Sequence, residues 1–144
     1  MNQAQRILND HDLEPIIEIK ELPSHGINTM MLLLGVFEHS LCCYFALGAR
    51  GKPAEQVATE ATEAFLGFLN SNGVFDEYSA DQLLLPLCLA KGTSQFATPR
   101  ITQHLITNAR VIQKFFGANI SVEGKLGKEG LVRIDGVDYP ARGH

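Results

Sequence analysis

The sequence lacks a hydrophobic stretch long enough to cross a membrane. Its longest apolar runs are residues 30–37 and 83–90, whereas a spanning helix needs about 20 residues. The first fifteen residues contain early acidic side chains and no apolar core run, so we do not expect a secretory signal. These absences predict a protein without membrane association.

Cysteine is scarce, and several catalytic motifs are absent. The three cysteines Cys42, Cys43 and Cys88 form no CxxC pair, and neighbouring cysteines rarely bridge because their side chains diverge. A reduced, cytoplasmic protein is therefore expected. All three thiols lie in apolar segments, where thiols are usually inert. The sequence has no GxSxG, Walker or HExxH motif.

Basic residues are fewer than acidic ones, and they are unevenly distributed along the chain. The chain has 12 Lys and Arg against 16 Asp and Glu, which argues against a broadly basic nucleic-acid-binding surface. Residues 1–72 carry 4 basic and 9 acidic side chains, whereas residues 73–144 carry 8 basic and 7 acidic ones. The second half is therefore the part expected to meet a phosphate-rich ligand.

The composition is that of a globular protein. Of the 144 residues, 45% are hydrophobic and 19% charged, which allows one domain or two small ones. The polar, turn-prone segment 70–73 coincides with the change in charge balance. We predict a domain boundary there, between domains 1–72 and 73–144.

The first half is predicted to contain strands followed by a helix. Residues 16–22 alternate between apolar and polar side chains, as in a half-buried strand. Apolar side chains recur at helical spacing after Pro53, opposite an acidic face. The expected elements are the end of a helix at 3–9, the strand 16–22, a turn at 23–26, a strand covered on both faces or a buried helix at 29–37, a strand at 40–47 paired with it across 38–40, and the amphipathic helix.

The second half is predicted to form helix, strand, helix, strand, strand. Ser79 and Gln82 have the spacing of a capping box ahead of a helix that is apolar on nearly every side and contains Pro86. Thr102 can cap a second helix that ends at Gly117. An extended segment at 94–98 separates the helices, and strands at 120–122 and 131–134 follow. This order predicts an α+β fold with helices packed on one face of a sheet.

His104 is the best candidate for a catalytic residue among the five histidines. It falls in the first turn of the second helix, where the helix dipole favours a neutral ring and free N–H groups can hold a phosphate. Arg100 and Thr107 flank it, and Asn108 lies one turn further on the same face, where it could orient the ring or bind a ligand. On its position alone, a polar first-turn histidine is more often a structural cap.

Asp81 and Gln82 form a second candidate pair at the start of the otherwise apolar helix. They present polar groups at its end. On spacing alone they can equally offset the helix dipole and complete the capping box.

Several segments together resemble a known family. They are Gly51-Lys52-Pro53-Ala54-Glu55-Gln56-Val57-Ala58, Ser79-Ala80-Asp81-Gln82-Leu83-Leu84-Leu85-Pro86-Leu87, Thr98-Pro99, and Gln103-His104-Leu105-Ile106-Thr107-Asn108 through Val111-Ile112. In this order they resemble the C-terminal part of the RNA 3′-terminal phosphate cyclase family, from about Gly51 to Val122. The combination of ADQLLLPL with HLxTN is the specific signal.

The resemblance implies a chemistry and a set of site residues. It implies that His104 accepts AMP from ATP, that the AMP passes to an RNA 3′-phosphate, and that the product is a 2′,3′-cyclic phosphate. It places the nucleotide-contacting residues at Tyr78, Ser79, Ala80, Asp81 and Gln82. A divalent metal, Mg or Mn, would neutralise the triphosphate.

The resemblance also implies an architecture. Residues 1–72 resemble most of a small insert domain, and residues 73–144 resemble the last repeat of a catalytic domain built from units like the C-terminal domain of translation initiation factor three. The family's N-terminal half is missing, so a separate N-terminal half or a homo-oligomer is expected as partner. The sequence departs from the family pattern at three places. Tyr78-Ser79 stands where members commonly have His-Leu, Cys88 stands where a small Ala is usual, and residues 91–94 stand where a glycine-rich stretch is typical.

Two other functions remain open from the sequence. The first is a catalytically inactive cyclase-like fragment that binds RNA or protein, comparable to the cyclase-like protein of ribosome assembly. The second is a relative of the enolpyruvate transferases, which share the repeated fold but in which an HLxTN-like motif is not expected.

Overall fold

The chain forms two compact units. The computed structural model describes residues 3–23 and 29–140. One unit comprises residues 1–36 and 43–67, and the other comprises residues 37–42 and 68–144. Assignment of residues 1–72 to an insert domain and of residues 73–144 to a repeat stays a prediction. Within the described part of the chain, no helix is long and apolar enough to cross a membrane.

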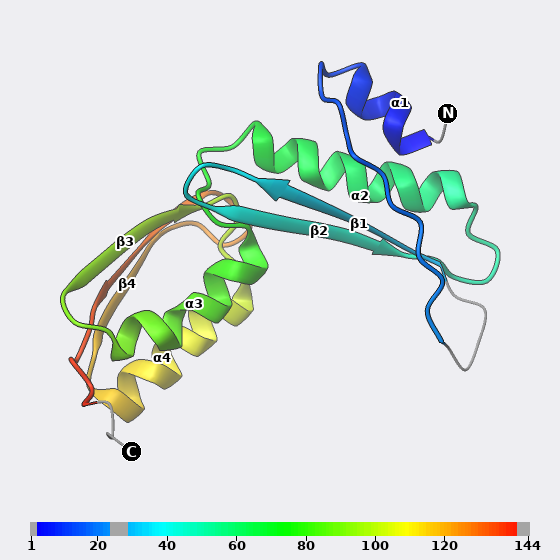
Figure 1. Ribbon diagram of the computed structural model, residues 1–144. Helices are drawn as coiled ribbons and strands as arrows, with labels where there is room; N and C mark the ends of the chain where they lie inside the picture. Colours follow the sequence, from blue (N-terminus) through cyan, green and yellow to red (C-terminus); the bar gives the residue numbers. More distant parts are fainter. Residues whose placement is uncertain (1–2, 24–28, 141–144) are drawn as a thin grey trace. The chain divides into compact units, whose positions relative to one another are not determined.

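The first unit is built on a β-hairpin and a helix. It contains α1 (Gln3–Asn9), β1 (Met30–Val36), most of β2 (Leu41–Leu47) and most of α2 (Ala54–Leu69). The two strands pair with each other, as predicted, and the Phe37 N–H donates to the Ser40 carbonyl at 3.0 Å in the turn between them. Val57 and Ala61 of α2 are buried against Ala46 of β2, so α2 covers one face of the hairpin (Figure 1).

Two predictions for this unit are wrong. Residues 16–22 form no strand, and the side chains of Ile16 and Ile19 are 96% and 91% exposed. The alternation gives the segment one apolar face, but a strand also needs a partner backbone, and it has none among the described residues. β1 is a strand, yet Leu32 and Leu34 are exposed, so it is covered on one face only. The turn expected at 23–26 lies largely outside the described residues.

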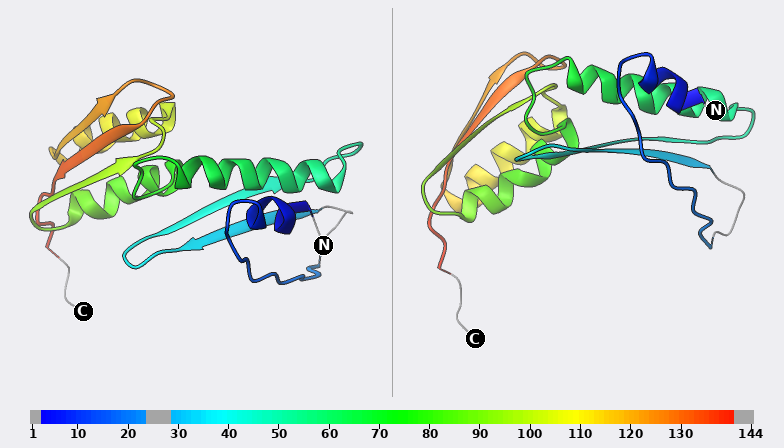
Figure 2. Two further views of the ribbon diagram at one scale, coloured as in Figure 1. Left: turned by 90° about the horizontal axis from the view of Figure 1, so that it is seen from above. Right: turned by 45° about the horizontal axis from the view of Figure 1, so that its top comes forward.

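The second unit confirms the predicted order of elements. It contains α3 (Glu77–Leu89), β3 (Thr93–Thr98), α4 (Gln103–Phe116), β4 (Asn119–Gly124) and β5 (Gly130–Asp135). β5 is the middle strand and pairs antiparallel with both neighbours, so β3 and β4 run parallel to each other on either side of it. Both helices lie on one face of this sheet (Figures 1 and 2). The α+β fold predicted from the sequence is thus confirmed.

The core of this unit lies between the helices and the sheet. Val132 and Ile134 of β5 are fully buried, as are Leu84 of α3 and Leu105 of α4. α3 is less buried than its apolar sequence predicts. Leu85 is 43% exposed, and only one face of the helix enters the core.

α4 begins and ends where the sequence predicts. The Leu105 N–H donates to Thr102 Oγ1 at 3.1 Å, which caps the first turn. At the other end, Gly117 adopts the left-handed conformation with φ of +68° and closes the helix.

The strand register defines two ends of the sheet. Thr98, Gly130 and Gly124 are aligned at one end, which we call the Gly130 end. Thr93, Asp135 and Asn119 are aligned at the other, which we call the Asp135 end. Since α4 follows the last residue of β3 and precedes the first residue of β4, its N-terminus lies at the Gly130 end.

The loop between β4 and β5 is attached to the residue that leads into α4. The Ile101 N–H donates to the Lys128 carbonyl and the Gly127 N–H to the Ile101 carbonyl, both at 2.8 Å. Ile101 also fills the space beside two glycines: a Cβ on Gly124, whose φ is +131°, would lie 2.7 Å from Ile101 Cδ1, and one on Gly130 would collide with the same atom. The loop is therefore held beside the start of α4.

A carboxylate connects all three strands at the Asp135 end. Asp135 accepts hydrogen bonds from Thr93 Oγ1 at 2.8 Å and from Asn119 Nδ2 at 3.0 Å. These two hydrogen bonds, followed by the nearby Arg133 guanidinium, lower the pKa of Asp135 below its ordinary value of 3.8.

Truncation of Leu84 should destabilise the second unit strongly. We expect Leu84→Ala to lower the free energy of unfolding by about 2–5 kcal/mol, because it opens a cavity in a closed core. Leu85→Ala, on the next and half-exposed position, should cost about 1 kcal/mol or less. Urea titration of both variants tests this, and equal losses would contradict the packing described.

Acidification should weaken the contribution of Asp135. Because its pKa is lowered in the folded protein, the carboxylate stabilises the fold above its ordinary pKa of 3.8, and this contribution is lost as the pH falls through the lowered value. Asp135→Asn should therefore be less stable than the unchanged protein near pH 6 and show a smaller loss on acidification to about pH 2.

Urea midpoints across this range measure the effect of Asp135. Asp138→Asn is the matched control, because the Asp138 carboxylate makes no hydrogen bond within the described residues. Parallel pH profiles for the unchanged protein and Asp135→Asn would refute the expectation.

Candidate active site

Asp76, rather than Ser79, caps the first helix of the second unit. The Asp76 carboxylate is buried, and its Oδ1 accepts from the backbone N–H groups of Tyr78 at 3.0 Å and Ser79 at 2.7 Å. The capping box predicted from Ser79 and Gln82 is therefore wrong, because α3 already begins at Glu77. Asp76 could have been found from the sequence, since Asp is a preferred capping residue directly ahead of the helix.

The predicted nucleotide-contacting residues occupy the first turns of α3. Tyr78 and Gln82 are exposed and Asp81 is partly buried; at 100° per residue these three share the outward side of the helix. Ala80 instead points into the core and is fully buried. The Ser79 hydroxyl donates to Asp76 Oδ2 at 3.0 Å.

His104 is exposed in the first turn of α4. Its ring makes no hydrogen bond or ion pair with any described residue. Arg100 precedes the helix and is also exposed. Thr107 accepts a long hydrogen bond of 3.4 Å from Gln103 Nε2. The imidazole is thus open to a reaction partner from solvent.

A hydrogen bond brings the two motifs together. Asn108 Nδ2 donates to Asp81 Oδ1 at 2.7 Å, across 27 positions of sequence. Asn108 lies one helical turn after His104 on the same side of α4. The polar start of α3 and the histidine-bearing start of α4 therefore form one continuous surface.

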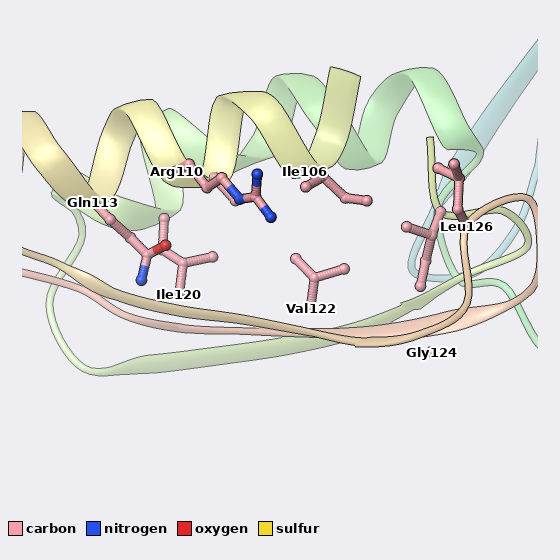
Figure 3. A pocket seen from close by; sticks show the side chains of 9 residues that line it. Ile106, Arg110, Gln113, Ile120, Val122, Gly124 and Leu126 are labelled. Carbon is pink, nitrogen blue, oxygen red and sulfur yellow. The ribbon is translucent and has the colours of Figure 1, made fainter. Parts of the chain in front are cut away.

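A pocket beside α4 lies away from this surface. A pocket of about 280 Å³ lies between α4 and β4, with Ile106, Arg110 and Gln113 on the helix side and apolar side chains from β4 opposite (Figure 3). At 100° per residue these helix positions lie about 180° to 240° around α4 from His104. The pocket is therefore separate from the surface that carries His104 and Asn108.

Metal ligands are sparse in the described ranges 3–23 and 29–140. They contain no cluster of three or more His, Cys, Asp or Glu side chains that could hold a metal ion. Magnesium is often held by one or two carboxylates together with substrate phosphates. Asp81, the carboxylate beside Asn108, fits that limited role.

Comparison with known proteins identifies the family. The family model for RNA 3′-terminal phosphate cyclase matches residues 4–122. The chain is 38% identical over 134 residues to the RNA 3′-terminal phosphate cyclase of Methylococcus capsulatus. The aligned residues are 93% of this chain and 37% of that protein. Its counterpart from Ralstonia nicotianae is 41% identical over 108 residues, covering 74% and 31% respectively. The chain belongs to the RNA 3′-terminal phosphate cyclase family.

The match also defines how much of a family member is present. The chain spans about a third of the length of the curated relatives it matches. The match begins at residue 4, well before Gly51, where the quoted motifs start. Residues of the first unit thus belong to the family pattern as well.

The hydrogen bond between Asn108 and Asp81 can be measured directly. In a double-mutant cycle with Asp81→Ala and Asn108→Ala, we expect a coupling of about 0.5–1.5 kcal/mol in the free energy of unfolding. Gln82→Ala paired with Asn108→Ala serves as the control, because no hydrogen bond joins Gln82 to Asn108. Additive effects of Asp81→Ala and Asn108→Ala would show that the bond does not form in solution.

Proposed function

We propose that this chain supplies the nucleophile-bearing C-terminal part of an ATP-dependent RNA 3′-terminal phosphate cyclase. The proposed reaction converts an RNA 3′-phosphate end into a 2′,3′-cyclic phosphate. The hydrogen bond between Asn108 and Asp81 is the observation that carries the proposal, because it joins the two family-like motifs in one surface. Family membership and an exposed His104 support it.

His104 performs the first step. A neutral ring nitrogen attacks the α-phosphorus of ATP, a P–N bond forms, and pyrophosphate leaves. A 3′-phosphate oxygen of the RNA then attacks the same phosphorus, which breaks the P–N bond and transfers AMP to the RNA. Finally the 2′-hydroxyl oxygen attacks the 3′-phosphorus, loses its proton, and expels AMP.

The neighbouring residues position the two substrates. Tyr78, Asp81 and Gln82 face outward beside His104 and contact the nucleotide, with Ser79 and Ala80 contributing through the backbone of the same turn. Arg100 offers a cation to a phosphate. Thr107 and Asn108 lie one helical turn after His104 and support the same surface of α4. A bound Mg²⁺ or Mn²⁺ would neutralise charge on the triphosphate.

The proposed partner is a separate N-terminal half of the enzyme or a second copy of the chain. The chain spans about a third of the length of the curated relatives it matches, and such a partner would complete the nucleotide site or cover the open faces of the chain. The described cysteines form no disulfide, which supports the reducing cytoplasm as the compartment.

Covalent labelling tests the proposal. The purified chain is incubated with Mg²⁺ or Mn²⁺ and ATP labelled at its α-phosphate, alone and together with the N-terminal two thirds of the Methylococcus capsulatus relative. We expect an acid-labile protein adduct in at least one arm, and a decrease of at least about 10²-fold in His104→Asn. Gln103→Ala, in the same helical turn, is the control.

Two results would overturn the proposal. One is the absence of an acid-labile adduct in both arms, and the other is equal labelling of His104→Asn and the unchanged chain. Tight RNA binding that persists in His104→Ala without any nucleotide binding would instead identify a non-catalytic cyclase-like fragment.

A further inference from the structure

Three cations gather at the Gly130 end of the second unit. Lys125 and Lys128 lie in the β4–β5 loop, and Arg100 directly precedes Ile101, to which this loop is hydrogen-bonded. All three side chains are exposed. The bond from the Ile101 N–H to the Lys128 carbonyl at 2.8 Å, and a turn from the Lys128 N–H to the Lys125 carbonyl at 3.0 Å, fix the backbone that carries them.

These cations have no partner among the described residues. Arg100, Lys125 and Lys128 take part in no ion pair and in no side-chain hydrogen bond there. Two carboxylates flank the loop, Glu123 on β4 and Glu129 beside Lys128. Glu129 accepts a hydrogen bond from Asn72 Nδ2 at 3.1 Å. The lysines are therefore available to an anionic ligand from solution.

The loop and the nucleotide-contacting helix lie on different sides of α4. α3 packs against β3 and β5, whereas α4 packs against β4, the strand that leads into the loop. Asp81 of α3 reaches α4 through Asn108, and Lys128 reaches the start of α4 through Ile101. His104 therefore has a polar helix start on one side and a cationic loop on the other.

We propose that Lys125 and Lys128 bind the phosphodiester backbone of the RNA strand whose 3′ end is presented to His104. The inference rests on the proposed function and extends it to a binding surface for the substrate. A single strand carries one negative charge per nucleotide, so the phosphates that precede the reacting end need cations outside the nucleotide site. Lysines on a short, backbone-anchored loop provide them at the end of the unit where His104 lies.

The salt dependence of RNA binding tests this surface. A short single-stranded RNA with a 3′-phosphate and a 5′ fluorophore is titrated with the full chain at several salt concentrations, without ATP. Each phosphate contact contributes about 0.7 to the slope of log affinity against log salt for a single strand. We expect Lys125→Gln/Lys128→Gln to reduce that slope by about 1.4 and to raise the Kd about 25-fold at ~0.1 M salt.

A matched variant removes the same charge from the other end of the unit. Lys114 lies in the last turn of α4 and Lys91 lies two residues before the start of β3, so both belong to the Asp135 end. Lys91→Gln/Lys114→Gln should change the Kd less than about threefold and leave the slope within about 0.3 of its original value. The single variants Lys125→Gln and Lys128→Gln should each lower the slope by about 0.7.

Several results would overturn this surface. They are equal losses in the two double variants, no change in the loop variant, and failure of the unchanged chain to bind RNA at low salt. A loss of ATP binding equal to the loss of RNA binding would assign the lysines to the triphosphate and also refute the proposal. Failure of the proposed function is recognised separately, as the absence of the His104 adduct, because the RNA titration contains no ATP.

Discussion

The pairing of β5 with both β3 and β4 is the constraint on which the second unit depends. β3 and β4 are not hydrogen-bonded to each other, so their pairing in one sheet depends on the middle strand. Val132 and Ile134 of β5 are fully buried beneath the helices. This one strand therefore pairs with both of its neighbours and also contributes to the centre of the core. The family model ends at residue 122, so the strand that unites this unit lies outside the matched segment.

Local signals explain what could be predicted from the sequence. α4 was predicted with both caps, because Thr102 and Gly117 act on backbone groups within one turn of themselves. The strand at 16–22 failed for the opposite reason. An alternating pattern describes one face of a strand, but the partner that would complete it is not specified by the segment itself.

The site was predictable in its residues but not in its connections. His104 and Asp81 were both singled out by their places in helix first turns. Their link through Asn108 depends on how α3 packs beside α4, and a spacing of 27 residues carries no such information. The predicted start of α3 was likewise wrong by three residues, because the buried Asp76, and not Ser79, caps the helix. The separation of the cavity from His104 also follows only from the side of α4 that each occupies.

The attachment of the β4–β5 loop to Ile101 divides that hairpin into fixed and variable positions. Gly124 and Gly130 have no room for a side chain beside Ile101, whereas the side chains at 125 and 128 project from the same loop into solvent. Charge at the tip can therefore change without disturbing the packing underneath. Substitutions at these two surface positions, in evolution or by design, can therefore change the charge of this end of the molecule and the ligands it attracts. The glycines meanwhile keep the backbone conformation of the loop.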